Sequence, residues 1–230
     1  MGYHASWIVQ ILPLLDAELA YRRVEPTLSV YAPSNQEVRR YQFDVLVCPT
    51  DWHTSNAELS ASVGITGLSS YAGNTGGENR PVDVDNKGIF FLNSSIGDKH
   101  IRDGLSNVLA VGERRLVEFH GQRDLGWMSG TSGTLRNCGI EINSGIPGFD
   151  STATSFDGSD ATAEAARETG IDDSNSNDLT SSGGFGSYHS AGLQVLLCDG
   201  SVRYMSESIS PWVFFSIANR DDGNFIDSSF

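Results

Sequence analysis

Three polar side chains near the C-terminal end have the residue types of a hydrolytic triad: Ser187, His189 and Asp199. In such a triad the histidine acts as general base for the serine and the aspartate orients the histidine. The local sequence GFGSYHSAGLQ, however, lacks the G-x-S-x-G elbow that exposes a nucleophilic serine. The mostly apolar residues 193–198 predict an extended segment that holds His189 and Asp199 far apart, at about 3.3 Å per residue. A hydrolase using His189 is therefore the least favoured interpretation.

Two oxygen-rich segments are candidates for calcium binding. VDVDNKG supplies Asp83, Asp85 and Asn86, and RDDGN supplies Asp221, Asp222 and Asn224. Calcium takes 6–8 oxygen ligands, often from closely spaced Asp and Asn. Neither segment has the glutamate that completes an EF-hand loop, and Asp, Asn and Gly are equally typical of turns. Calcium is the only cofactor that the sequence suggests, and solvated turns are the favoured alternative.

Three aromatic residues lie near loops rich in Gly, Ser and Asn and have the chemistry to stack on sugar rings: Trp52, Tyr71 and Trp127. They favour a polysaccharide-binding module as an alternative function. The other interpretation, that these rings belong to a hydrophobic core, is the more common situation for aromatic side chains.

Charge and hydropathy exclude several classes of protein. The 230 residues include 15 Lys plus Arg against 29 Asp plus Glu, a net charge of -14. A nucleic-acid binder needs a basic surface to neutralise phosphates, and an anionic lipid surface would repel this chain. Residues 147–187 carry many of the acidic residues among Ser, Thr and Gly, and they predict a long polar excursion with a short helix at 161–168.

The remaining pattern predicts an α+β domain. Apolar spacing indicates a helix over residues 6–23, interrupted at Pro13. A β-hairpin is expected where Asp199-Gly200 joins residues 193–198 to 201–205 through a type I′ turn. A C-terminal helix over 211–219 would turn Trp212, Phe215 and Ile217 inward. Further strands are expected at residues 41–48, 68–72, 89–92 and 108–119. Glu113 with Arg114 is expected to form a surface or strand-end ion pair.

The three cysteines, Cys48, Cys138 and Cys198, are too few for a disulfide scaffold and lack the spacing of a zinc site. Their odd number leaves two possibilities open: one bridge with a free thiol, or three thiols.

Several fragments occur together in a characteristic order. They are SWIVQILPLL, VCPTD, SSYAGNTG, GIFF, IRDGLSNVLAVGER and FGSYHSAGLQVLLCDGSVRYMSESI. The set resembles the planctomycete prepilin-like family of unknown function (domain of unknown function 1559), which has an H-X9-DG signature. Here His189, nine intervening residues, Asp199 and Gly200 match that signature.

The resemblance implies a single pilin-like headpiece over residues 1–230, with a mainly antiparallel sheet packed against an N-terminal helix and with long polar loops. His189, Asp199 and Gly200 would be fold-defining residues without a catalytic role. The implied protein is a non-enzymatic, extracytoplasmic structural subunit at the cell surface, in the periplasm or secreted. Its membrane and assembly helix would precede the present sequence.

The expected partners are other pilin-like subunits and secretion or cell-surface components, with glycans as a further candidate. An oxidising compartment would permit one disulfide bridge, for which Cys48 and Cys138 are the expected pair.

Overall fold

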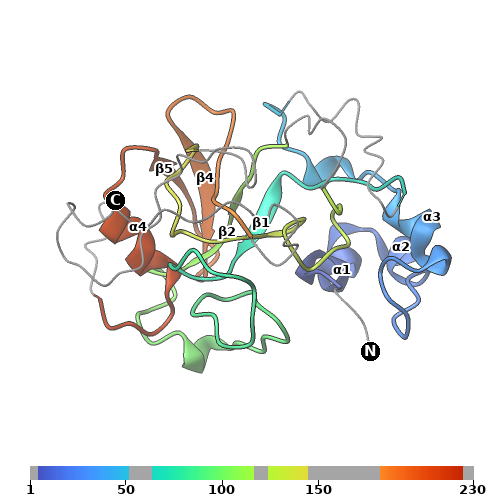
Figure 1. The fold of residues 1–230 in the computed structure, drawn as a ribbon, viewed down its shortest axis with the longest axis horizontal. Coiled ribbons are helices and arrows are strands. Elements are labelled where there is room, and N and C mark those ends of the chain that lie inside the picture. The colour runs from blue at the N-terminus through green and yellow to red at the C-terminus, as the bar shows by residue number, and fades with distance from the viewer. Residues whose placement is uncertain (1–4, 52–63, 117–123, 145–181, 225–230) are drawn as a thin grey trace. The chain divides into compact units, whose positions relative to one another are not determined.

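The computed structural model describes residues 5–51, 64–116, 124–144 and 182–224 (Figure 1). The chain divides into two compact units, and each is built from two separated stretches of sequence. Unit 1 comprises Met1–Tyr71 and Leu116–Thr134, and unit 2 comprises Ala72–Arg115 and Leu135–Phe230. Neither unit is a continuous segment, and the single headpiece expected over residues 1–230 stays a prediction.

Unit 1 is built from short helical elements. They are α1 (Trp7–Ile11), a 3-10 turn (Leu12–Leu15), α2 (Glu18–Tyr21), a 3-10 turn (Pro33–Asn35), α3 (Gln36–Arg39) and a 3-10 turn (Asp44–Leu46). The predicted interruption at Pro13 is confirmed, because Pro13 lies in the turn that ends α1 and Asp16 then adopts a left-handed φ of 56° before α2. Ile8 and Leu12 pack with Trp127, and all three are fully buried.

The strand predicted at residues 41–48 is wrong. Leu46 N donates to Phe43 O and Val47 N to Asp44 O, so the backbone is bonded within a short turn instead of to a neighbouring strand. Leu46 and Cys48 are nevertheless buried, whereas Val45 is exposed. The apolar composition correctly indicated burial, but the choice of strand required a pairing partner that the segment does not have.

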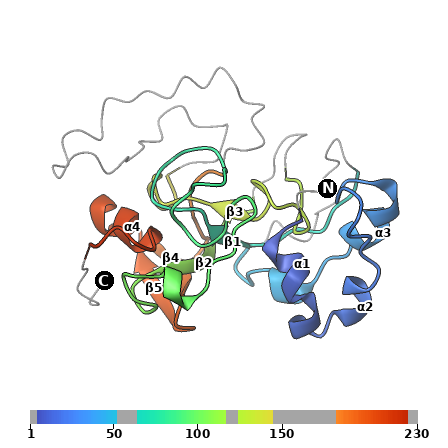
Figure 2. The same cartoon turned by 90° about the horizontal axis from the view of Figure 1, so that it is seen from below.

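Unit 2 contains a five-stranded sheet in the order β3-β1-β2-β4-β5 (Figure 2). Its elements are β1 (Tyr71–Asn74, whose first residue belongs to unit 1), a 3-10 turn (Asp98–His100), β2 (Leu109–Glu113), β3 (Leu135–Arg136), β4 (Gly192–Leu197), β5 (Val202–Ser206) and α4 (Pro211–Ala218). The β2–β4 and β4–β5 pairs are antiparallel and the β1–β3 pair is parallel. The predicted α+β class is confirmed.

The helix that packs on this sheet is α4. Phe214 and Ile217 join Leu109, Leu193 and other strand residues in one buried cluster, which contains no side chain from α1. The predicted helix over 211–219 is confirmed in position, but Trp212 is 41% exposed and Phe214 takes the expected inward place. The strand predicted at 89–92 is also wrong, because Ile89 N and Phe90 N both donate to Asn74 O and the chain turns there.

The predicted hairpin forms, with a different turn. Gly200 has a φ of 87°, whereas Asp199 is absent from the described residues with positive φ. A type I′ turn requires positive φ at both central residues. The turn instead closes through Gly200 N to Leu197 O, with Cys198 and Asp199 at its centre and Gly200 in the left-handed position after them.

The Asn74 side chain joins three elements of unit 2. Its amide nitrogen donates to Leu109 O of β2 (2.9 Å) and to Ala218 O at the end of α4 (2.7 Å), and its Oδ1 accepts from Gly76 N (2.8 Å). Asn74 is fully buried. A buried backbone carbonyl or amide needs a partner, and here one side chain supplies three.

We therefore expect Asn74→Leu to lower the free energy of unfolding by about 3 kcal/mol or more, because three buried backbone groups lose their partner. Asn107→Ala is the matched control: it removes one half-buried bond, from the Asn107 amide to Asp103 O, and should cost about 1 kcal/mol. Urea denaturation followed by circular dichroism measures both. Equal losses in the two variants would contradict the role given to Asn74.

Candidate functional site

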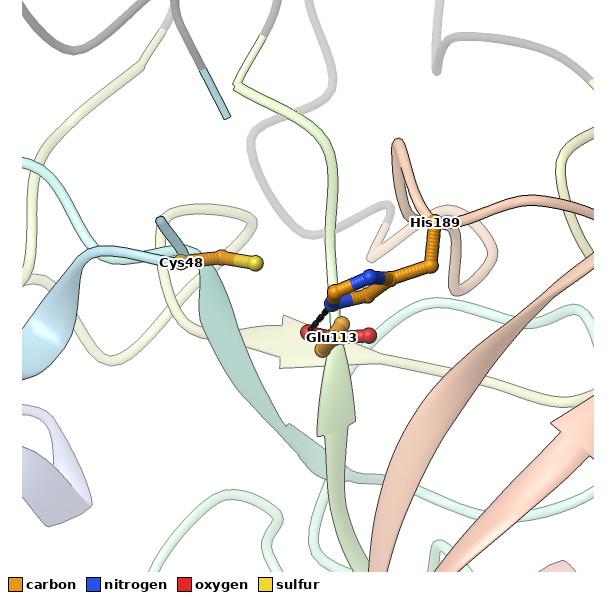
Figure 3. Close-up of side chains that lie close together, drawn as sticks. All are labelled: Cys48, Glu113 and His189. Carbon is orange, nitrogen blue, oxygen red and sulfur yellow. Dashed lines mark hydrogen bonds and ion pairs between the residues drawn. The ribbon is translucent and has the colours of Figure 1, made fainter. Parts of the chain in front are cut away.

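The signature histidine faces a buried carboxylate in unit 2 (Figure 3). His189 Nε2 lies 3.1 Å from Glu113 Oε1, and Glu113 Oε2 accepts a 2.7 Å hydrogen bond from Gln194 N. The Glu113 side chain is 4% exposed and that of His189 is 32% exposed. The pair thus places a carboxylate in the interior and an imidazole at its solvent side.

Two backbone contacts and one close approach between a glycine and an aromatic ring position this pair. Glu113 ends β2, and Gly112 before it pairs with Val195 of β4. Gly186 N donates to Glu113 O, which holds the chain before His189 against the end of β2. Any side chain at Gly112 would collide with the Phe185 ring, since an added Cβ would lie 2.7 Å from it. The loop and the strand can approach closely only because this position is glycine.

Neighbouring polar groups hold the loop itself. Ser187 N donates to Asn143 Oδ1, and His189 N donates to Ser187 Oγ at 3.2 Å. Arg115 donates to Asn143 O and lies over the Tyr188 ring, 5.9 Å from its centre. The Ser187 hydroxyl is thus engaged by the backbone of His189, and the partner that faces the imidazole within unit 2 is Glu113, so the described geometry does not form a Ser-His-Asp triad.

Glu113 was not identified correctly from the sequence. The expected surface position of Glu113 and Arg114 is wrong, because both residues are only 3% exposed. Glu113 does end β2, as expected of a strand-end residue. Glu113 and His189 are 76 positions apart, and no local pattern links them. Only the pairing of β2 with β4 brings them together.

The other two signature residues lie at the opposite end of β4. Asp199 Oδ1 accepts from both Ser201 N (2.8 Å) and Ser201 Oγ (2.6 Å). The hydrogen bond from the Ser201 hydroxyl, followed by that from its backbone amide, lowers the pKa of Asp199. Gly200 supplies the left-handed φ of the same turn. His189 and Asp199 therefore fix the two ends of one hairpin.

The first segment predicted to bind calcium is a turn closed by its own side chains. Asn86 Oδ1 accepts from Asp83 N, Asp83 Oδ1 accepts from Val84 N, and Asp85 pairs with Arg80. These are the local bonds that Asp and Asn form in turns.

The second segment has the same character. Asp222 accepts from Asn224 N and from the Asn219 amide, and Asn224 donates to Ser216 Oγ. Arg220 donates to the carbonyls of Asn86 and Gly88, so a guanidinium already links the two segments. Asp221 is exposed. Calcium binding at either segment stays a prediction.

Within either unit, no three His, Cys, Asp or Glu side chains among the described residues gather closely enough to hold a metal ion. Of the aromatic residues proposed to stack on sugars, Trp127 is fully buried and donates its indole N–H to Tyr41 O, Tyr71 is half-buried, and Trp52 lies outside the described residues.

The cysteines are free thiols, so the bridge predicted between Cys48 and Cys138 is not formed in this structure. Cys138 is 3% exposed in the core of unit 2, and burial raises its pKa. Cys48 belongs to unit 1, where its Sγ lies 3.1 Å from Thr50 Oγ1. Cys198 is half-buried, and burial, followed by the charges of Asp199 and Asp98, raises its pKa to about 12.

Most of the polar excursion predicted at residues 147–187, including the helix at 161–168, lies outside the described residues. The prediction is wrong for residues 182–187, most of which are buried: Ser182 is fully buried and Phe185 is 2% exposed in the core of unit 2. Phe185 packs against Phe214 of α4 with ring centres 6.4 Å apart, and a position inside the core leaves no freedom for a solvated loop.

Comparison with known proteins identifies one family. The model described as "Protein of unknown function (DUF1559)" matches residues 2–211. No curated protein and no solved structure matches this chain significantly. No helix in the described part of the chain combines the length and the hydropathy needed to cross a membrane.

We expect that removing the Glu113 side chain lowers the stability of the protein. Glu113→Leu leaves the half-buried Gln194 N–H without its acceptor and should lower the free energy of unfolding by about 1–3 kcal/mol. Glu113→Gln keeps an oxygen in that place and should cost less. Glu141→Leu, at an exposed position of the same unit, is the control and should stay within about 0.5 kcal/mol of wild type in urea denaturation. A Glu113→Leu variant as stable as this control would show that the pair is dispensable for folding.

The cysteines give a second prediction. Unfolding the chain without reductant should release three thiols that react with a chromogenic disulfide reagent, and the Cys198→Ser variant should release two. In the folded protein at pH 8, Cys198 should react with iodoacetamide at least about a hundredfold more slowly than free cysteine, because a pKa near 12 leaves very little thiolate. A single reactive thiol after unfolding would instead reveal a bridge.

Proposed function

This chain belongs to the DUF1559 family of proteins of unknown function, and from that premise we propose that it is a non-enzymatic structural subunit located outside the cytoplasm. In this proposal it is a pilin- or pseudopilin-like headpiece that presents its surface to other subunits or to cell-surface components. The ordered motifs resemble a prepilin-like family, and this resemblance supports a location outside the cytoplasm.

One observation carries the structural role: the signature residues are engaged in holding their own hairpin. His189 faces the buried Glu113 at one end of β4, and Asp199 with Gly200 forms the turn at the other. Within unit 2 these side chains satisfy buried or turn-forming groups, which is the role of residues that define a fold.

The hairpin also supports a role in assembly. Its second strand, β5, lies at the edge of the sheet and exposes apolar side chains, with Val202 65% and Tyr204 47% exposed. Exposed edge strands are common sites of association between chains. A subunit whose regular hairpin also forms an exposed edge is suited to binding other subunits.

Protease protection in the native cell tests the proposal. Antibodies against this chain should detect it in the envelope or extracellular fraction, and external protease should digest it in intact cells or in cells whose outer layer has been opened. A cytoplasmic protein of the same cells serves as the control and should stay intact. Co-fractionation with that control, with protection from protease until the inner membrane is lysed, would contradict an extracytoplasmic subunit.

A further inference from the structure

The two edges of the sheet in unit 2 differ sharply. One edge, β3, is two residues long, and Leu135 and Arg136 are 4% and 5% exposed. The other edge, β5, is five residues long and alternates between exposed and buried positions. Val202 and Tyr204 share its solvent face, whereas Met205 on the opposite face is in the core. Only β5 offers an accessible edge in the described part of this sheet.

The outer side of β5 has unused backbone groups. Leu197 N donates to Ser201 O and Glu207 N donates to Ala191 O. Because bonded and non-bonded pairs alternate in an antiparallel ladder, Arg203 and Met205 bond to β4, and Val202 and Tyr204 point their N–H and C=O groups away from it. Within the described residues no backbone group meets those of Val202 and Tyr204 on that side.

Proteins usually protect such an edge with proline, lysine, a bulge or a covering element. The β5 sequence VRYMS contains no proline or lysine, and its register with β4 is continuous over all five residues from Val202 to Ser206. The one charged residue, Arg203, lies on the opposite face from Val202 and Tyr204. The strand is therefore regular and exposes Val202 and Tyr204, and its outer side pairs with no other strand in the described part of the chain.

We propose that β5 pairs antiparallel with β5 of a second copy of this chain, about a two-fold axis at Tyr204. This register places Tyr204 opposite Tyr204 of the second copy, where the two residues exchange a pair of backbone hydrogen bonds. Val202 then lies opposite Ser206 of the second copy. The two five-stranded sheets become one continuous sheet, which satisfies the outer groups of both edge strands.

Charge favours a second copy as the occupant. In the same register Arg203 lies diagonally across from Glu207 of the second copy, a spacing that long side chains can bridge. Glu207 is exposed, and the two-fold axis produces this opposite-charge pair twice. The Tyr204 hydroxyl already donates to Ser190 O (2.8 Å), so the ring is fixed before association and loses little freedom.

Opposite charges at Tyr204 test the two-fold register. We expect the wild-type chain to form a reversible dimer in sedimentation velocity over a concentration series. Tyr204→Lys and Tyr204→Glu each place like charges opposite one another on the axis, and each should raise the dissociation constant at least about tenfold. An equal mixture of the two variants should recover the dimer, because lysine then faces glutamate.

Two controls separate this effect from others. Tyr204→Phe removes the bond to Ser190 O but keeps the ring, and it should still dimerise. Val84→Lys adds the same charge at another exposed position of unit 2 (59% exposed) and should also dimerise. Circular dichroism checks that every variant is folded.

The proposal is overturned if the wild-type chain stays monomeric, or if the Tyr204→Lys and Tyr204→Glu variants dimerise like wild type. If the equal mixture of these two variants stays monomeric, the two-fold register at Tyr204 is wrong. These results are independent of the cellular location, so the proposed extracytoplasmic role can stand or fall separately.

Discussion

The sheet of unit 2 depends on one buried amide, the side chain of Asn74. A carbonyl or amide that leaves water without a partner costs as much as several apolar contacts contribute. Asn74 meets this constraint at the point where β1, β2 and α4 converge. Gly88 packs directly on this residue, where an added Cβ would lie 2.4 Å from Asn74 O. The contacts of Asn74 therefore fix how closely the segment around Gly88 approaches, as well as the position of α4.

The same constraint explains the signature histidine. At the end of β2, the Glu113 side chain accepts a hydrogen bond from Gln194 N–H and faces His189, so this buried polar group has partners in the interior. The two ends of the β4–β5 hairpin are thus fixed by different chemistry, a carboxylate–imidazole pair at one end and an aspartate–glycine turn at the other. A hairpin held at both ends presents its outer strand in one defined conformation.

The regular edge strand β5, which pairs with no other strand on its outer side within the described residues, connects the fold to the proposed role in assembly. Folding leaves the outer groups of β5 hydrated and accessible, and pairing with a like strand replaces these water contacts with a ladder of hydrogen bonds. The net charge of -14 opposes close approach of two copies, so a specific contact has to be local and directional. Backbone pairing, with Arg203 diagonally across from a glutamate of the second copy, has that character.

The sequence alone determined the elements whose signals are local. Pro13 interrupted the N-terminal helix, Asp199-Gly200 placed the hairpin, Pro211 began α4, and the ordered motifs identified the family. Tertiary structure decided the rest. Residues 41–48 have strand composition but no strand to pair with. Trp212 is exposed and Phe214 is buried, because the sheet selects which face of α4 is buried. Glu113 meets His189 only through the β2–β4 register, which no spacing in the sequence encodes, because strand pairing is a long-range choice made by burial and by the partners available.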